Sequence, residues 1–258
     1  MHFILLILLG VLCFLLRFIP LNSTPYPLPL PDSPYNSLQV KFLCERGVLY
    51  FDAPILGFAV AALINFIVCD ATLAVKIAAS LFAAGSALST FYFAKSIRGR
   101  SIDGLLASLA VAFSSFSFRM AEHLLKNSAA VAFMPIAVAN YFIGLKFMDR
   151  RKILIASLFS CLVAFSHTST AGLTASILVS ITLYFLFKRI WERKYSDALF
   201  LLAYAVLSAL MMISAFFIAD FVSPYYSAEY TSIDVGKAIS YVGGGAESPL
   251  RVLFKVKG

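Results

Sequence analysis

Residues 71–118 read ATLAVKIAASLFAAGSALSTFYFAKSIRGRSIDGLLASLAVAFSSFSF, and this stretch decides the fold class. Two apolar blocks, Ala71–Ala94 and Gly104–Phe118, flank a short loop that carries three cations. A transmembrane helix needs about 17–25 mostly apolar residues, whereas strands of a membrane barrel would alternate in segments of about ten. The stretch therefore predicts two membrane-spanning helices joined on the cytoplasmic side, where Lys and Arg accumulate.

The whole chain has the composition of a membrane protein. Hydrophobic residues make up 61% of its 258 positions and charged residues 13%, and the mean hydropathy is +0.89. A soluble domain carries about 25% charged residues, so the predicted fold class is all-α, a polytopic helical protein in a lipid bilayer. The net charge of +8 does not indicate nucleic acid, because the basic residues gather in short loops between apolar blocks.

Eight apolar blocks follow one another along the chain. They are Phe3–Ile19, Pro54–Cys69, Ala71–Ala94, Gly104–Phe118, Ser128–Leu145, Ile153–Ser166, Gly172–Phe187 and Ala198–Val222. Three loops between them are basic: Lys95/Arg98/Arg100, Lys146/Arg150/Arg151/Lys152 and Lys188/Arg189/Arg193/Lys194. These loops hold eleven of the 21 Lys and Arg residues, so all three should face the cytoplasm.

The basic loops constrain the number of crossings. If the first helix leaves the cytoplasm, an odd number of crossings must separate the loop at 20–53 from Lys95. The block Pro54–Cys69 is short and bounded by Asp52 and Asp70, so we interpret it as an interfacial or re-entrant helix. We therefore expect about seven crossings in the cell membrane with a cytoplasmic N-terminus, and only Arg17 at the outer end of the first helix opposes this orientation.

One transmembrane domain, 1–258, is expected. It divides into a first helix at 1–19, an outer loop at 20–53, a helical bundle at 54–222 and a further outer loop at 223–258. Because the chain ends in this last loop, we expect an N-terminal fragment of a longer protein or a split gene product. Within the first loop, residues 36–46 predict an amphipathic juxtamembrane helix ended by Gly47. Its lipid-facing residues should be Leu38, Phe42 and Leu43.

Both expected outer loops carry acids. Five prolines between residues 20 and 31 stiffen the backbone before Asp32, so this segment can hold a carboxylate over the membrane surface. The second loop, 119–127, contains Arg119, Glu122 and Lys126, which would share one face of a helix. The same loop also fits a plain set of ion pairs at a helix surface.

Several short motifs follow one another in a characteristic order. They are Asp32-Ser33-Pro34-Tyr35, Glu45-Arg46-Gly47, Asp52-Ala53-Pro54-Ile55-Leu56, Tyr92-Phe93-Ala94-Lys95 and Ser117-Phe118-Arg119-Met120-Ala121-Glu122. In this order they resemble the N-terminal core of GT-C membrane glycosyltransferases, which include protein mannosyltransferases, aminoarabinose transferases and oligosaccharyltransferase catalytic subunits. The resemblance implies a core of about seven helices and transfer of a sugar, with inversion, from a polyprenyl phosphate. The acceptor would be a lipid, glycan or protein on the outer face.

The chemistry of such a transfer suggests roles for individual residues. A base must take a proton from the acceptor hydroxyl, and cations must stabilise the departing phosphate. The catalytic candidates are Asp32 as the base, Asp52 as its alternative, and Glu122, which would orient the acceptor or bind a divalent cation such as Mg²⁺ or Mn²⁺. The candidates for binding the donor phosphate are Arg119, Lys126 and Tyr35.

Two other classes of function stay open. A transporter or lipid-carrier flippase should carry ionisable residues inside its spans near the midplane, whereas the acids here gather at the outer interface. A non-catalytic GT-C paralogue would keep the fold without the activity. Two further polar positions have structural interpretations: His167 should cap a tight turn between helices, and Lys76 should extend its ammonium to the interface.

Overall fold

The computed structural model describes residues 2–24, 33–47, 49, 54–115, 117 and 125–222. Every regular element within these residues is an α-helix, which confirms the predicted all-α class. The helices are α1 (His2–Asn22), α2 (Ser33–Arg46), α3 (Leu56–Val68), α4 (Ala71–Arg98), α5 (Ser101–Phe113), α7 (Leu125–Phe147), α8 (Arg150–Ser166), α9 (Thr168–Trp191) and α10 (Tyr195–Val222).

Capping residues determine where several helices begin and end. Asp70 precedes α4, and its carboxylate accepts hydrogen bonds from the backbone N–H groups of the second and third helical residues. Asp149 caps α8 in the same way. Gly47 and Gly99 follow α2 and α4 with φ of 73° and 78°, the left-handed conformation that glycine adopts without strain.

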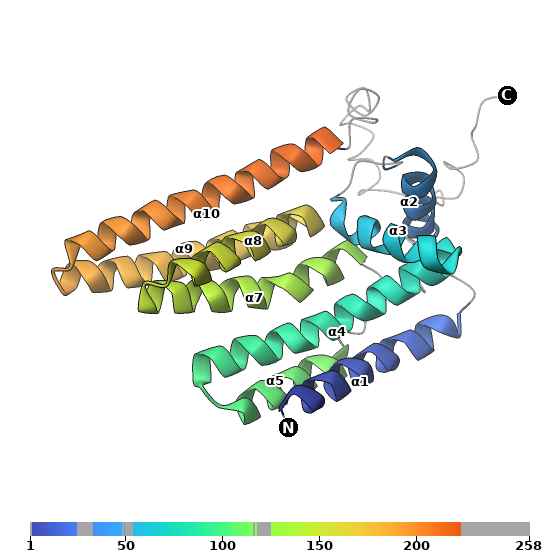
Figure 1. Cartoon of the computed structure of the whole chain (residues 1–258), viewed down its shortest axis with the longest axis horizontal. Coiled ribbons are helices and arrows are strands. Elements are labelled where there is room, and N and C mark those ends of the chain that lie inside the picture. The colour runs from blue at the N-terminus through green and yellow to red at the C-terminus, as the bar shows by residue number, and fades with distance from the viewer. Residues whose placement is uncertain are drawn as a thin grey trace, which may run out of the picture.

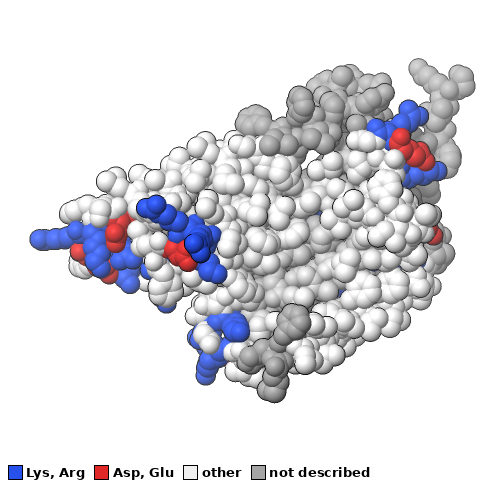
Figure 2. Space-filling view, viewed as in Figure 1, with Lys and Arg blue, Asp and Glu red and all other residues white. Residues whose placement is uncertain are grey.

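Five helices are long and apolar enough to cross a membrane. They comprise Ile4–Asn22, Ala71–Arg98, Leu125–Phe147, Thr168–Trp191 and Tyr195–Ala215, while Leu56–Val68 and Ser101–Phe113 are shorter apolar helices. Large apolar side chains such as Ile67 and Leu199 are exposed on the outside. Figure 2 shows that Lys, Arg, Asp and Glu gather toward the two ends of the molecule, with an uncharged surface between them. These features support a membrane-embedded helical protein, and the count of seven crossings stays a prediction.

The long helices lie side by side, and the chain reverses direction at each turn between them (Figure 1). α4 and α7 pack together at the centre, with α1 and α5 against α4, α8 and α9 against α7, and α10 against α8 and α9. The turns between α4 and α5, α7 and α8, and α9 and α10 consequently lie at one end, which we call the basic end (Figures 1 and 2). α2 and α3 lie at the other, which we call the α2 end.

Arg17, the residue that opposes the predicted orientation, is not a loop residue. Its side chain is buried within α1, and Nη2 donates a 2.6 Å hydrogen bond to the backbone oxygen of Ala112. This oxygen lies in the last turn of α5, where helical carbonyls lack backbone partners and carry partial negative charge. Because the orientation rule counts cations in loops, a buried arginine that caps a neighbouring helix carries little weight in it.

Polar side chains between the long helices bond mainly to one another or to the backbone. The hydroxyls of Tyr141 and Thr182 are 2.7 Å apart, joining α7 to α9, and Tyr92 donates to Asn140 at 2.9 Å, joining α4 to α7. Hydrogen bonds between transmembrane helices contribute about 0.6 kcal/mol each on average. These groups therefore have a structural use that accounts for their burial.

The face that α2 turns toward the protein differs in part from the prediction. Asn36, Gln39 and Val40 are buried, and Leu43 packs against the core cluster that includes Val40. Residues three and four apart share a helix face, so Leu43 lies on the protein side. Its predicted contact with lipid is wrong, because hydropathy does not distinguish a leucine that faces lipid from one that faces another helix.

Candidate functional site

Two of the six predicted site residues lie within the described chain, and both are at the α2 end. Tyr35 is in the first turn of α2, and Lys126 is in the first turn of α7. The other four predicted residues, Asp32, Asp52, Arg119 and Glu122, lie outside the described residues. Their assignment as catalytic or phosphate-binding groups stays a prediction.

The structure brings Tyr35 and Lys126 into direct contact. The Lys126 Nζ lies 5.6 Å from the centroid of the Tyr35 ring, a distance at which a cation is attracted to an aromatic face. The Tyr35 ring also packs edge-on against Phe58 of α3, with ring centroids 5.9 Å apart. The contact thus joins residues that are 91 positions apart in the sequence.

Close packing of α3 on α7 makes this contact possible. A Cβ on Gly57 would lie 3.6 Å from both the Leu125 oxygen and the Lys126 Cα, so the start of α3 rests directly on the start of α7. α2 in turn packs against α3. Three helix starts therefore meet at Lys126, and each contributes partial positive charge from unpaired backbone N–H groups.

His167 lies in the turn between α8 and α9, and its imidazole interacts electrostatically with the Lys126 ammonium. Its Nδ1 accepts a hydrogen bond from the Thr170 N–H at 3.2 Å, which caps α9 and confirms the predicted role in the turn. Burial lowers the pKa of the imidazole below its ordinary value of 6.5, and Lys126 lowers it further. A neutral ring that accepts at Nδ1 carries its proton on Nε2, so His167 is a neutral hydrogen-bond donor at neutral pH.

Lys76 is a second cation at the α2 end. Its side chain is buried in α4, and Nζ donates a 2.6 Å hydrogen bond to the backbone oxygen of Thr24. The ammonium therefore lies beside the end of α1, and its extension to the membrane interface stays a prediction.

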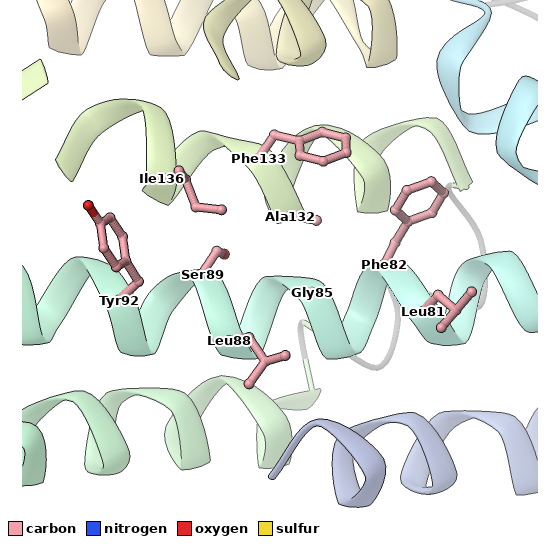
Figure 3. A pocket seen from close by; sticks show the side chains of 9 residues that line it. All are labelled: Leu81, Phe82, Gly85, Leu88, Ser89, Tyr92, Ala132, Phe133 and Ile136. Carbon is pink, nitrogen blue, oxygen red and sulfur yellow. The ribbon is translucent and has the colours of Figure 1, made fainter. Parts of the chain in front are cut away.

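An apolar pocket of about 580 Å³ lies between α4 and α7, away from Tyr35 and Lys126 (Figure 3). Its lining residues are Leu81, Phe82, Gly85, Leu88, Ser89, Tyr92, Ala132, Phe133 and Ile136. The polar groups among them are occupied, because Ser89 donates to the Ser86 oxygen and Tyr92 donates to Asn140. This pocket suits a hydrocarbon chain and carries no base or metal ligand.

The described part of the chain contains no preformed site for a divalent cation. No three His, Cys, Asp or Glu side chains gather there in a way that could hold a metal ion. The four cysteines are free thiols. Glu122, the proposed metal ligand, lies outside the described residues, so the predicted Mg²⁺ or Mn²⁺ remains an expectation.

No family model, curated protein or solved structure matches this chain. The resemblance to GT-C glycosyltransferases thus rests on the short motifs quoted from the sequence. The structure shows in addition that Lys126, Tyr35 and the neutral His167 lie near one another at the α2 end.

Proposed function

We propose that the chain is the core of a GT-C type membrane glycosyltransferase that transfers a sugar from a polyprenyl phosphate to an acceptor at the α2 end. The observation that carries the proposal is the 5.6 Å contact between the Lys126 ammonium and the Tyr35 ring. Both residues were predicted from the sequence to bind the donor phosphate. Their contact supports a shared binding role, and it also holds the lysine beside the starts of three helices.

The proposed reaction is a single displacement at the sugar C1. Asp32 takes the proton from the acceptor hydroxyl, the hydroxyl oxygen forms a bond to C1, and the bond from C1 to the phosphate oxygen breaks. The phosphate leaves with the electron pair, and the configuration at C1 inverts. Lys126 and Arg119 would stabilise the growing negative charge on the phosphate, while Glu122 would orient the acceptor or hold a divalent cation.

The distribution of buried charge favours this proposal over transport. Arg17 and Lys76 are buried cations of the described long helices, and each donates to a backbone oxygen at the end of a neighbouring helix. Transport sites usually lie near the midplane, at interrupted helices. In the described spans, the mid-helix polar groups named above instead form helix-to-helix hydrogen bonds. A flippase and a non-catalytic paralogue remain the alternatives.

The decisive experiment measures transfer of labelled sugar from a panel of polyprenyl-phosphate sugars in membranes that contain the full-length protein. Lys126→Ala should raise the donor concentration for half-maximal rate and slow transfer about 10- to 100-fold, because a hydrogen bond to a charged group contributes about 1.5–3 kcal/mol. Lys41→Ala is the matched control, since Lys41 is an exposed lysine at the same end that pairs with Glu45. It should leave transfer unchanged.

Substitutions at Tyr35 test the contact itself. Tyr35→Phe keeps an aromatic face for the Lys126 ammonium and should retain more transfer than Tyr35→Ala. Equal activity of Lys126→Ala and the unmutated protein would reject the proposed donor site. If the unmutated protein transfers no sugar from any donor tried, the non-catalytic paralogue becomes the better explanation.

A further inference from the structure

The three basic loops look alike in sequence, but in the structure they differ in how many of their cations form ion pairs with carboxylates. In the turn between α4 and α5, Asp103 Oδ2 lies 3.7 Å from Arg98 Nε and 3.3 Å from Arg100 Nε. One carboxylate thus faces both arginines beside this turn. Lys95, at the end of α4, lies over the Phe91 ring.

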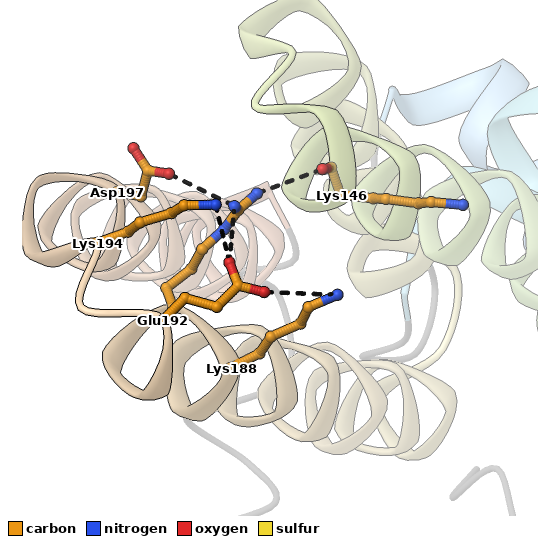
Figure 4. A network of polar contacts seen from close by, with 6 residues as sticks. Lys146, Lys188, Glu192, Lys194 and Asp197 are labelled. Atoms are coloured by element: carbon orange, nitrogen blue, oxygen red, sulfur yellow. Dashed lines mark hydrogen bonds and ion pairs between the residues drawn. The ribbon is translucent and has the colours of Figure 1, made fainter.

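The turn between α9 and α10 is balanced more fully (Figure 4). Glu192 lies 3.0 Å from Lys194, 3.6 Å from Arg189 and 4.0 Å from Lys188, and its hydrogen bond with Lys194 is the main cause that lowers its pKa. Asp197 lies 3.6 Å from Arg189 as well. Two acids therefore offset half of the positive charge of the four cations in this turn.

In the turn between α7 and α8, the positive charge of the side chains is not balanced by ion pairs among the described residues. Four cations belong to it: Lys146, Arg150, Arg151 and Lys152. Its acid, Asp149, accepts hydrogen bonds from the backbone N–H groups of Arg151 and Lys152, at 2.9 and 3.3 Å. Within the described residues, no carboxylate lies within ion-pair distance of any of the four cations. Asp149 caps the start of α8, so the cationic side chains are available to bind an external anion.

Aromatic rings lie beside the cations of this turn. The Lys146 Nζ lies 5.1 Å from the centroid of the exposed Phe147 ring, and the Arg150 guanidinium lies 5.6 Å from that of Phe200. Trp191, at the end of α9, is 90% exposed. Exposed aromatic side chains at the ends of transmembrane helices mark the boundary between hydrocarbon and water.

We propose that the turn between α7 and α8 binds the head group of an anionic phospholipid in the leaflet that the basic end faces. Three cations occupy the first turn of α8, where the helix dipole disfavours positive charge, so a bound anion would relieve this repulsion. A soluble acidic partner would use the cations but not the neighbouring rings, whereas a lipid uses both. The site is at the opposite end from the proposed transferase site and does not depend on it.

The chain contains a single tryptophan, which provides a local probe. In the full-length double variant Trp191→Phe, Phe147→Trp, the only tryptophan stands next to Lys146. This protein is placed in phosphatidylcholine vesicles that contain increasing amounts of brominated phosphatidylglycerol, and the quenching of its fluorescence is measured. We expect stronger quenching by brominated phosphatidylglycerol than by brominated phosphatidylcholine at equal mole fraction, and weaker selectivity as salt is raised.

Two arginine pairs supply matched variants in this background. Arg150→Gln with Arg151→Gln should weaken phosphatidylglycerol selectivity by up to roughly thirtyfold, about fivefold for each cation. Arg98→Gln with Arg100→Gln removes the same charge from the turn in which Asp103 pairs with both arginines, and it should change selectivity little. The conservative pair Arg150→Lys with Arg151→Lys should restore most of the selectivity.

Four results would overturn the proposal. Equal quenching by the two brominated lipids would show an ordinary lipid annulus. Equal loss from both arginine pairs would show a general effect of net charge. Relief of quenching by inorganic phosphate, at matched ionic strength, would assign the turn to a free anion. Relief by a soluble acidic peptide under the same conditions would favour a protein partner. If the glutamine variants do not fold, the salt dependence of the parent probe still decides the question.

Discussion

Replacing Gly144 by alanine should separate α7 from α8 and destabilise the basic end. A Cβ at this position would lie 2.5 Å from Ile153 Cγ1 and 3.0 Å from the Ile153 backbone nitrogen. The isoleucine is fully buried, and the backbone nitrogen cannot move alone, so α8 itself must shift. Overpacking of this kind costs about 1–3 kcal/mol, and the better helix propensity of alanine offsets about 0.8–1 kcal/mol.

The net expectation for Gly144→Ala is a loss of up to about 2 kcal/mol, or roughly 4–8 °C in unfolding temperature at about 2–4 °C per kcal/mol. The control is Gly172→Ala in α9, where a Cβ would meet nothing within 4 Å. It should be neutral or raise the unfolding temperature slightly, since alanine favours the helix. Thermal unfolding of the purified proteins in detergent measures both changes. An unfolding temperature for Gly144→Ala equal to that of Gly172→Ala would refute the close contact between α7 and α8.

Three further predictions concern topology, catalysis and pH. Cysteines introduced at Arg98, Arg150 and Arg193 should be shielded from an impermeant thiol reagent in intact cells, while one at Ser33 should react; the reverse pattern would invert the orientation. Asp32→Asn should slow sugar transfer about 10²–10⁴-fold without reducing the amount of folded protein, and undiminished transfer would move the role of base to Asp52. His167 has a lowered pKa, so its contribution to stability is present above its ordinary value of 6.5 and is lost as the pH falls below that value. The unfolding temperature should therefore fall less on acidification in His167→Asn, which keeps a capping side chain, than in the parent protein.

The apolar pattern of the sequence predicted the helices well because helix formation in a membrane depends on local composition. Backbone groups in hydrocarbon must be satisfied within the same segment, so a long apolar block is sufficient to indicate a helix. The ends were less predictable. α4 was expected to stop at Ala94 but continues to Arg98, since the basic residues continue the helix until Gly99 ends it. α8 begins at Arg150, before the apolar block, because Asp149 caps it.

The candidate site was less predictable because its geometry depends on contacts between distant segments. The sequence assigned Tyr35 and Lys126 to the same ligand, but it contained no sign that their side chains would touch. That contact requires α3 to lie against the start of α7, where a Cβ on Gly57 would meet the backbone of Leu125 and Lys126 at ordinary van der Waals distance. The proximity of His167 to Lys126 likewise follows from the packing of the turn between α8 and α9, where a local interpretation as a cap was correct but incomplete.

Charge distribution shows most clearly what a sequence pattern leaves undetermined. A count of basic residues weighs Arg17, Arg98 and Arg151 equally, although they differ in surroundings. Arg17 is buried and donates to the end of α5, and Arg98 is paired with Asp103, while Arg151 has an exposed side chain with no carboxylate partner among the described residues. Of the three, only Arg151 is both exposed and without a carboxylate partner among the described residues, so it is the most available to an external anion. Interactions with the membrane surface should therefore follow the unpaired cations of the turn between α7 and α8 more closely than the total number of Lys and Arg residues.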